Sequence, residues 1–294
     1  MSTKTVSWLV FVFLCFIWGS SFILMSYSKD ELPAPQIAAV RIFSAGLVFL
    51  PFGIMHFNKI PRNKLLLVIM TGVFGNLVPA FLFAEAIAHD IDSSIAGILN
   101  SLTPVCVVAI AVIYFKDRVS TRQILGVMLG FAGLVALTLS RGDVSLQNIG
   151  YSLLIVIGTM SYGVNVNLVS HHLKGVNPLH MASVSLSFML IPTALVLWQQ
   201  NFVQTDFSRP EMQNALWASV ALGVVGSAVA TALFYLLVQK AGGLFASLVT
   251  YGIPFVALFW GFIYGEQITV MVIACLSVIL IGVFLANWRT AKSD

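Results

Sequence analysis

Charged residues are scarce in this sequence. Lysine, arginine, aspartate and glutamate together make up 9% of its 294 residues, whereas a typical soluble domain contains about 25%. Hydrophobic residues account for 59%, and the mean hydropathy is +0.97. This composition excludes an ordinary soluble globular protein and predicts an all-α integral membrane protein.

Motifs for cofactors, metals and nucleotides are also missing. The three cysteines, Cys15, Cys106 and Cys275, are far apart and form no CxxC pair. There is no glycine-rich phosphate loop, which argues against ATP-driven pumping. His89, Asp90 and Asp92 lie close together but lack further ligands, so we interpret them as a solvated turn. We expect no cofactor, no metal and no nucleic-acid partner.

Long uncharged runs separate the few charges. A helix of about 20 residues crosses the roughly 30 Å of a bilayer core, and each run is long enough to do so. The sequence therefore predicts ten transmembrane helices, at residues 7–27, 34–56, 65–88, 93–115, 121–140, 148–170, 178–198, 213–239, 243–264 and 268–287.

Lysine and arginine are distributed unevenly between the two sides of these helices. With a cytoplasmic N-terminus, three cations lie outside (Lys29, Arg141 and Arg209) and eleven lie inside: Lys4, Lys59, Arg62, Lys64, Lys116, Arg118, Arg122, Lys174, Lys240, Arg289 and Lys292. Cytoplasmic loops carry an excess of these residues, so both termini are predicted to be cytoplasmic. The net charge of +4 reflects this orientation. Compact loops without an Asn-x-Ser/Thr sequon suit a bacterial inner membrane.

The two halves of the chain resemble each other. GVFGNLVPAFLF (72–83) and GVVGSAVATALF (223–234) are identical at six of twelve positions, and Pro104 pairs with Pro254 further on. We expect two five-helix repeats, residues 1–142 and 143–294. Because five is odd, the second repeat enters the membrane upside down, and such inverted repeats are typical of secondary transporters.

Particular segments resemble the EamA family of the drug/metabolite transporter superfamily. They are Trp18-Gly19-Ser20-Ser21-Phe22, Arg41, the stretch from Pro104 to Asp117 and its copy from Pro254 to Glu266. The resemblance implies a ten-helix carrier for small metabolites, often an amino-acid exporter, whose central cavity is lined by helices 1, 3, 4, 6, 8 and 9. Lys116-Asp117 departs from the Gly-Glu common in the family, and we assign that pair no role in transport.

Aromatic and amide side chains are the first candidates for substrate binding. Trp18 and its counterpart Tyr162 each adjoin a glycine near the middle of a helix, where they would face each other across a central pocket. Polar side chains in a membrane must point into the bundle or a wet cavity, which adds Asn76, Asn100, Asn165 and Tyr251. The alternative is that the aromatics only fill a core and the amides only join helices.

Two ionisable residues lie within the predicted spans. Arg41 is about 10 Å from the outer start of its helix and Glu85 about 5 Å from the outer end of its own, by the helical rise. Either they pair, or Arg41 binds a substrate carboxylate while Glu85 meets an amine or a proton. The alternative is that Arg41 snorkels outward and Glu85 is interfacial.

We interpret the protein as a secondary transporter that exports small organic metabolites such as amino acids by alternating access. With so few charges in the spans, a zwitterionic or neutral substrate fits better than a phosphorylated one. The alternative is a membrane enzyme acting on a lipid-linked substrate, but this would require clustered Asp or His at one membrane face. Proton coupling and facilitated diffusion both fit the sequence, which sets no oligomeric state.

Overall fold

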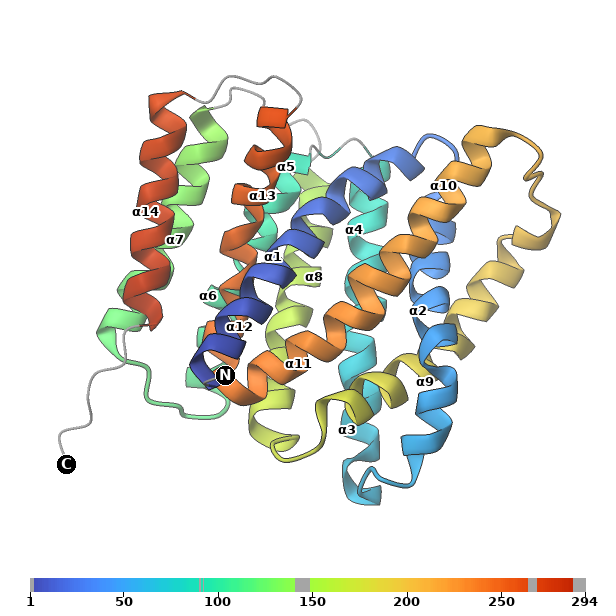
Figure 1. The fold of residues 1–294 in the computed structure, drawn as a ribbon, viewed down its shortest axis with the longest axis horizontal. Coiled ribbons are helices and arrows are strands. Elements are labelled where there is room, and N and C mark those ends of the chain that lie inside the picture. Colours follow the sequence, from blue (N-terminus) through green and yellow to red (C-terminus); the bar gives the residue numbers. More distant parts are fainter. Residues whose placement is uncertain (1–2, 90, 92, 141–148, 264–268, 288–294) are drawn as a thin grey trace.

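The structure is a computed structural model that describes residues 3–89, 91, 93–140, 149–263 and 269–287, and its regular elements in these ranges are all helices (Figure 1). The first half holds α1 (Thr3–Ser28), α2 (Ala34–Phe57), α3 (Arg62–Gly72), the π-helix η1 (Val73–Leu77), α4 (Val78–Ala88), α5 (Ser93–Asn100), α6 (Thr103–Ile113) and α7 (Thr121–Ser140).

The second half continues with α8 (Ile149–Asn167), the π-helix η2 (Leu168–His172), α9 (Pro178–Gln199), the short 3₁₀ helix η3 (Phe202–Gln204), α10 (Pro210–Ala221), the π-helix η4 (Leu222–Val229), α11 (Ala230–Ala241), α12 (Gly243–Ser247), α13 (Val249–Ile263) and α14 (Val270–Asn287). At Gly242 the backbone φ is +93°, which glycine adopts without strain, and this allows the tight turn from α11 into α12.

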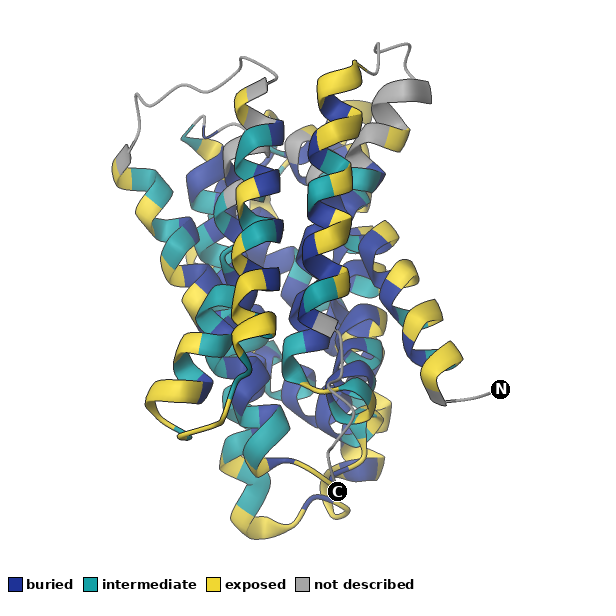
Figure 2. Cartoon of the chain, turned by 90° about the vertical axis from the view of Figure 1, so that its left-hand side faces the viewer, coloured by how far each residue is buried: buried dark blue, intermediate teal, exposed yellow. Residues whose placement is uncertain are grey.

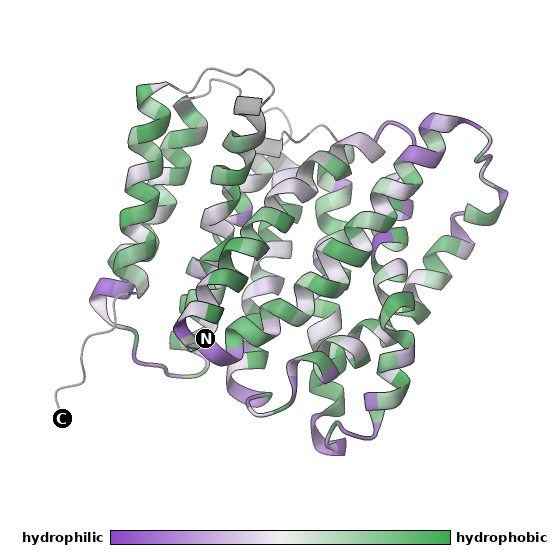
Figure 3. Cartoon of the chain, in the orientation of Figure 1, coloured by the Kyte–Doolittle hydropathy of each residue, from purple (hydrophilic) through white to green (hydrophobic). Residues whose placement is uncertain are grey.

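Among the described residues, six helical segments are long and apolar enough to cross a membrane: Lys4–Ser21, Ala34–Phe57, Arg62–Ala88, Gly150–His172, Pro178–Gln199 and Pro210–Ala241. Four shorter apolar segments accompany them: Thr103–Ile113, Thr121–Leu137, Gly243–Val256 and Val270–Ala286. Each overlaps one of the predicted spans. Figure 3 shows the same pattern, with apolar helix bodies and hydrophilic residues gathered near the helix ends.

Large apolar side chains point outward from the bundle. Leu9, Val12 and Phe13 of α1 are each at least half exposed, whereas Leu14 on the opposite face is fully buried. Figure 2 shows buried residues inside and exposed residues along the outer helix faces. Exposed apolar faces of this extent are stable only when lipid covers them, which agrees with a membrane protein.

The described cations gather at one end of the bundle. The start of α1, the α2–α3, α6–α7 and α8–α9 connections and the end of α14 all lie at the lower end in Figure 1. The nine described cations that were predicted to be inside belong to these segments or to the end of α11, whereas Lys29 and Arg209 belong to connections at the other end. Arg141, Arg289 and Lys292, together with Asp90, Asp92 and Glu266, lie outside the described residues.

Glycine contacts bring helices from the two halves together. A Cβ atom added to Gly19 of α1 would lie 2.6 Å from Val256 Cβ of α13, and one added to Gly163 of α8 would lie 2.9 Å from Cys106 Cβ of α6. Both distances are shorter than carbon atoms tolerate, so only glycine fits. Each contact therefore joins one half of the chain to the other.

Helices α7 and α14 pack against each other at one edge of the bundle (Figure 1). A Cβ atom on Gly126 would meet the Ala286 backbone, and one on Gly282 would meet the Gly130 backbone. Small residues four positions apart allow such close approach between membrane helices. Gly126 and Gly282 therefore allow the backbones of α7 and α14 to come into contact.

Candidate functional site

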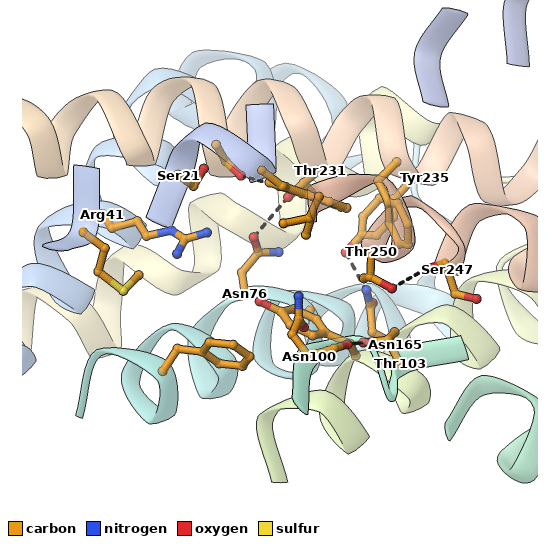
Figure 4. A pocket seen from close by; sticks show the side chains of 18 residues that line it. Ser21, Arg41, Asn76, Asn100, Thr103, Asn165, Thr231, Tyr235, Ser247 and Thr250 are labelled. Carbon is orange, nitrogen blue, oxygen red and sulfur yellow. Dashed lines mark hydrogen bonds between the residues drawn. The ribbon is translucent and has the colours of Figure 1, made fainter. Parts of the chain in front are cut away.

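A cavity of about 100 Å³ lies in the centre of the bundle and is large enough for several water molecules. Both halves of the chain contribute to its wall, shown in Figure 4. The lining residues are Trp18, Ser21, Met25, Arg41, Gly75, Asn76, Phe83, Asn100, Thr103, Tyr162, Asn165, Gly226, Thr231, Phe234, Tyr235, Ser247, Thr250 and Ile253.

Two π-helices, η1 and η4, border the cavity. They occupy corresponding positions when residues 72–83 are aligned with residues 223–234. Pro79, the second residue of α4, has no N–H to donate to the Gly75 carbonyl of η1. The N–H of Val78, just before it, bonds to the Val73 carbonyl five residues earlier, as in a π-helix. A π-helical turn accommodates the missing bond at the expense of regular packing, and such turns occur often at functional sites.

Helix η4 leaves one carbonyl available in a different way. The Ala230 N–H bonds to the Val225 and Ser227 carbonyls, so it does not take the Gly226 carbonyl as an α-helix would. The indole Nε1 of Trp18 donates to the Gly226 oxygen at 3.0 Å instead. The Trp18 ring also packs on Phe234, with their centroids 5.3 Å apart. Trp18 therefore links α1 to η4 at the cavity wall. Gly19 beside it allows α13 to pack closely against α1.

Arg41 brings a positive charge to the cavity from α2. Its Nε donates to Ser227 Oγ of η4 at 2.9 Å. The two segments touch closely, because a Cβ on Gly223 would meet the Arg41 carbonyl. A cation within a membrane span costs at least about 2.5 kcal/mol on insertion scales, so such residues normally face the interior of the bundle, as Arg41 does here.

Amide side chains form the polar part of the wall. Thr231 Oγ1 donates to Asn76 Oδ1 at 3.0 Å, while Asn76 Nδ2 is buried with no hydrogen-bond partner in the described structure. Asn100 Oδ1 is likewise buried and unpartnered. On the opposite side of Figure 4, the Tyr235 hydroxyl lies 3.4 Å from Asn165 Oδ1 and 3.3 Å from the Thr71 carbonyl. These contacts join α11 to α8 and α3.

Six of the eight residues predicted from the sequence lie on the cavity wall: Trp18, Arg41, Asn76, Asn100, Tyr162 and Asn165. Tyr251 does not. Its hydroxyl donates to the Val127 carbonyl at 2.8 Å, and its ring fills the space beside Gly130 of α7. The side chain is fully buried between helices and is satisfied there.

Glu85 is also absent from the wall. Its side chain is 43% exposed, and its Oε1 lies 3.5 Å from His89 Nδ1 one turn later. The expected pair with Arg41 is not formed, because Arg41 turns toward Ser227. Glu85 therefore lies beside His89 near the end of α4, away from the cavity wall.

Several lining residues were not predicted. Thr231, Phe234 and Tyr235 all follow the π-helix η4 on α11, and Phe83 holds the matching position to Phe234 in the first half. The alignment of 72–83 with 223–234 was the available signal, since both segments end in Leu-Phe. Thr103 and Ser247 are small hydroxyl residues that carry no distinctive pattern, and Ser21 was noted only as part of the Trp18–Phe22 segment.

Residues 6–139 and 149–288 each match the EamA-like transporter family. An uncharacterized transporter of Archaeoglobus fulgidus is 24% identical over 279 residues, covering 95% of this chain and 97% of the relative. The uncharacterized inner membrane transporter YedA of Escherichia coli K12 is 24% identical over 284 residues, covering 93% of this chain and 88% of the relative. A solved structure described as "Crystal structure of protein" is 18% identical and has a TM-score of 0.72. The match covers 97% of this chain and 98% of the chain in that structure, so the two proteins share a fold.

Proposed function

The chain belongs to the EamA-like transporter family, within the drug/metabolite transporter superfamily, and from this premise we propose that it is a secondary transporter exporting small organic metabolites, amino acids among them. The observation that carries the proposal is the central cavity, whose wall combines aromatic faces, amides and one cation from both halves of the chain. A concave, partly apolar site with a few converging polar groups suits an organic solute.

The proposed architecture is ten transmembrane helices in two inverted five-helix repeats, residues 1–142 and 143–294. Two observations support it. The π-helices η1 and η4 occupy aligned positions, and Gly19 meets Val256 while Gly163 meets Cys106, with Cys106 and Val256 both two residues after an aligned proline. Two related halves around one site can exchange inward-open and outward-open arrangements, which is how alternating access works.

We place the protein in the bacterial inner membrane with both termini in the cytoplasm. The asymmetric distribution of lysine and arginine supports this orientation. The similarity to YedA, named as an inner membrane transporter, supports the location.

Within the cavity, Arg41 is the proposed partner of a substrate carboxylate, because a guanidinium can bind both carboxylate oxygens at once. Trp18 and Tyr162 provide surfaces for the organic body, and Asn76, Asn100 and Asn165 provide hydrogen bonds. Glu85 and Tyr251 are left out of this proposed site. Coupling to protons, if present, would have to use a group other than Glu85.

The test is counterflow in proteoliposomes that contain the purified full-length protein. Vesicles are preloaded with unlabelled metabolites of one chemical class, and uptake of a labelled member is followed at several pH values. We expect transient accumulation with carboxylate-bearing metabolites, and a pH response if protons are coupled. Equal uptake in protein-free vesicles for every class would overturn the proposed function.

A further inference from the structure

Arg41 is the only charged side chain among the 18 cavity-lining residues, all of which the structure describes. Its hydrogen bond to Ser227 uses Nε, which leaves the edge formed by the two terminal guanidinium nitrogens for a ligand. No aspartate or glutamate lies on this wall. The cavity wall therefore carries one positive charge that no other lining residue balances.

Two buried amide atoms are also without partners. Asn76 and Asn100 are each 7% exposed, and both line the cavity. The Asn76 carbonyl oxygen already accepts from Thr231, so the atom left over is the Nδ2 donor. On Asn100 the atom left over is the Oδ1 acceptor. A buried polar atom without a partner is unfavourable, so these two atoms require a ligand or water that offers an acceptor to Asn76 and a donor to Asn100.

Several other polar groups on the wall bond to the protein itself. Thr103 Oγ1 donates to the backbone carbonyl of Asn100 at 2.6 Å, and Thr250 Oγ1 donates to the backbone carbonyl of Ser247 at 3.0 Å. Figure 4 shows Asn76 and Asn100 between Arg41 on one side and Ser247 and Thr250 on the other. The charge of Arg41 and the two unpartnered amide atoms therefore call for one anion, one hydrogen-bond acceptor and one donor.

Charge balance distinguishes two kinds of carboxylate ligand. A monoanion neutralises Arg41, so the loaded cavity has no net charge. A zwitterion also brings an ammonium group, for which the wall offers only neutral acceptors such as Asn100. In a low-dielectric interior an ammonium without a counter-charge is strongly disfavoured, whereas a neutral N–H donor satisfies Asn100 without that penalty.

We propose that the cavity binds organic monoanions that carry a carboxylate, a neutral N–H donor and an apolar or aromatic body, in preference to zwitterions of the same shape. N-acylated amino acids have this chemistry. The carboxylate binds Arg41 and Asn76 Nδ2, the amide N–H meets Asn100 Oδ1, and the body packs between Trp18 and Phe83. This inference rests on the proposed function and narrows its substrate class.

The test uses three compounds with the same aromatic body and different charge: N-acetyl-L-phenylalanine, L-phenylalanine and L-phenylalaninamide. Binding to the purified full-length protein is measured by thermal stabilisation, and transport by counterflow in proteoliposomes. We expect the N-acetyl monoanion to bind at least about tenfold more tightly than the zwitterion, and the cation not to bind. Equal or tighter binding of L-phenylalanine would overturn the monoanion preference and leave the transporter proposal standing.

A carboxylate placed in the cavity provides a second test. Asn100→Asp gives an ammonium group a counter-charge, so this variant should shift the preference from the monoanion toward L-phenylalanine. The matched control is Asn63→Asp, the same change at an exposed position near the start of α3. A folded Asn100→Asp protein that still prefers the monoanion would contradict the proposed contact of Asn100 with the ligand N–H. If that variant does not fold, the comparison of the three compounds on the wild-type protein still tests the monoanion preference. No uptake of these compounds or of the wider metabolite classes would overturn the proposed function as well.

Discussion

The indole nitrogen of Trp18 donates to the Gly226 carbonyl at 3.0 Å, which links the first helix of one half to the π-helix of the other. The π-turn frees this carbonyl because the Ala230 N–H bonds elsewhere. Trp18→Phe keeps an aromatic ring on the cavity wall but removes the donor. We expect a loss of about 0.5–1.5 kcal/mol in stability and slower exchange, measured by thermal unfolding and counterflow.

Trp8→Phe is the control for that change, because Trp8 lies on the same helix but is 36% exposed on the outer surface. It should leave exchange unchanged. If Trp18→Phe and Trp8→Phe behaved alike, the link between α1 and η4 would have no role in transport.

Gly19 and Gly163 should be equally intolerant of a methyl group. Gly19→Ala would press on Val256, and Gly163→Ala on Cys106, so each should cost about 1–3 kcal/mol through overpacking. Thermal unfolding of the purified variants measures the cost. Gly150→Ala is the control, since an added Cβ there meets nothing within 4 Å. A tolerated Gly19→Ala would contradict the close approach of α1 and α13.

Arg41 should determine whether carboxylate-bearing solutes bind. Arg41→Gln removes the charge and should weaken their binding at least about tenfold, since hydrogen bonds to charged groups contribute roughly 1.5–3 kcal/mol. Arg41→Lys keeps the charge but cannot bind a carboxylate in a bidentate manner, so this variant should retain part of the affinity for carboxylate-bearing solutes. Substrate-induced thermal stabilisation measures both. Arg209→Gln, at an exposed ion pair with Glu31, should have no effect.

The orientation in the membrane can be tested with single cysteines. In intact cells, an impermeant maleimide should label Ser208→Cys, in the connection between α9 and α10, and spare Asn63→Cys at the start of α3. Both positions are exposed, so accessibility alone does not distinguish them. The reverse pattern would invert the proposed topology.

The positions of the apolar helices were predictable from the sequence because lipid imposes a simple rule of length and polarity. The interruptions after Asn100 and after Ser247, inside the predicted spans 93–115 and 243–264, were not predicted. Arg41, Asn76, Asn100 and Asn165 were predictable for the same reason, since polar groups in a span must turn inward. That rule does not tell whether an inward-facing polar side chain lines a cavity or lies in an interface between helices. Tyr251 obeys it by donating to the Val127 carbonyl, away from the cavity.

The π-helices were not predicted, although Pro79 in the first half was a signal that the helix could not continue with regular bonding. The second half has Ala230 at the aligned position, so its π-helix depends on tertiary contacts such as that of Trp18. Only the depth of Glu85 along the helix axis follows from the sequence, whereas its half-exposed position beside His89 depends on the rotation of the helix, which depth does not determine.

The most direct test of the central claim is labelling of the cavity from each side of the membrane. Ser21→Cys, with Cys15, Cys106 and Cys275 replaced by alanine, places one thiol on the wall. An impermeant maleimide is applied to right-side-out and to inverted vesicles, with and without substrate. Alternating access predicts labelling from both sides and slower labelling when substrate is bound. Labelling from neither side, or from one side only under every condition, would contradict a cavity that opens to each face in turn.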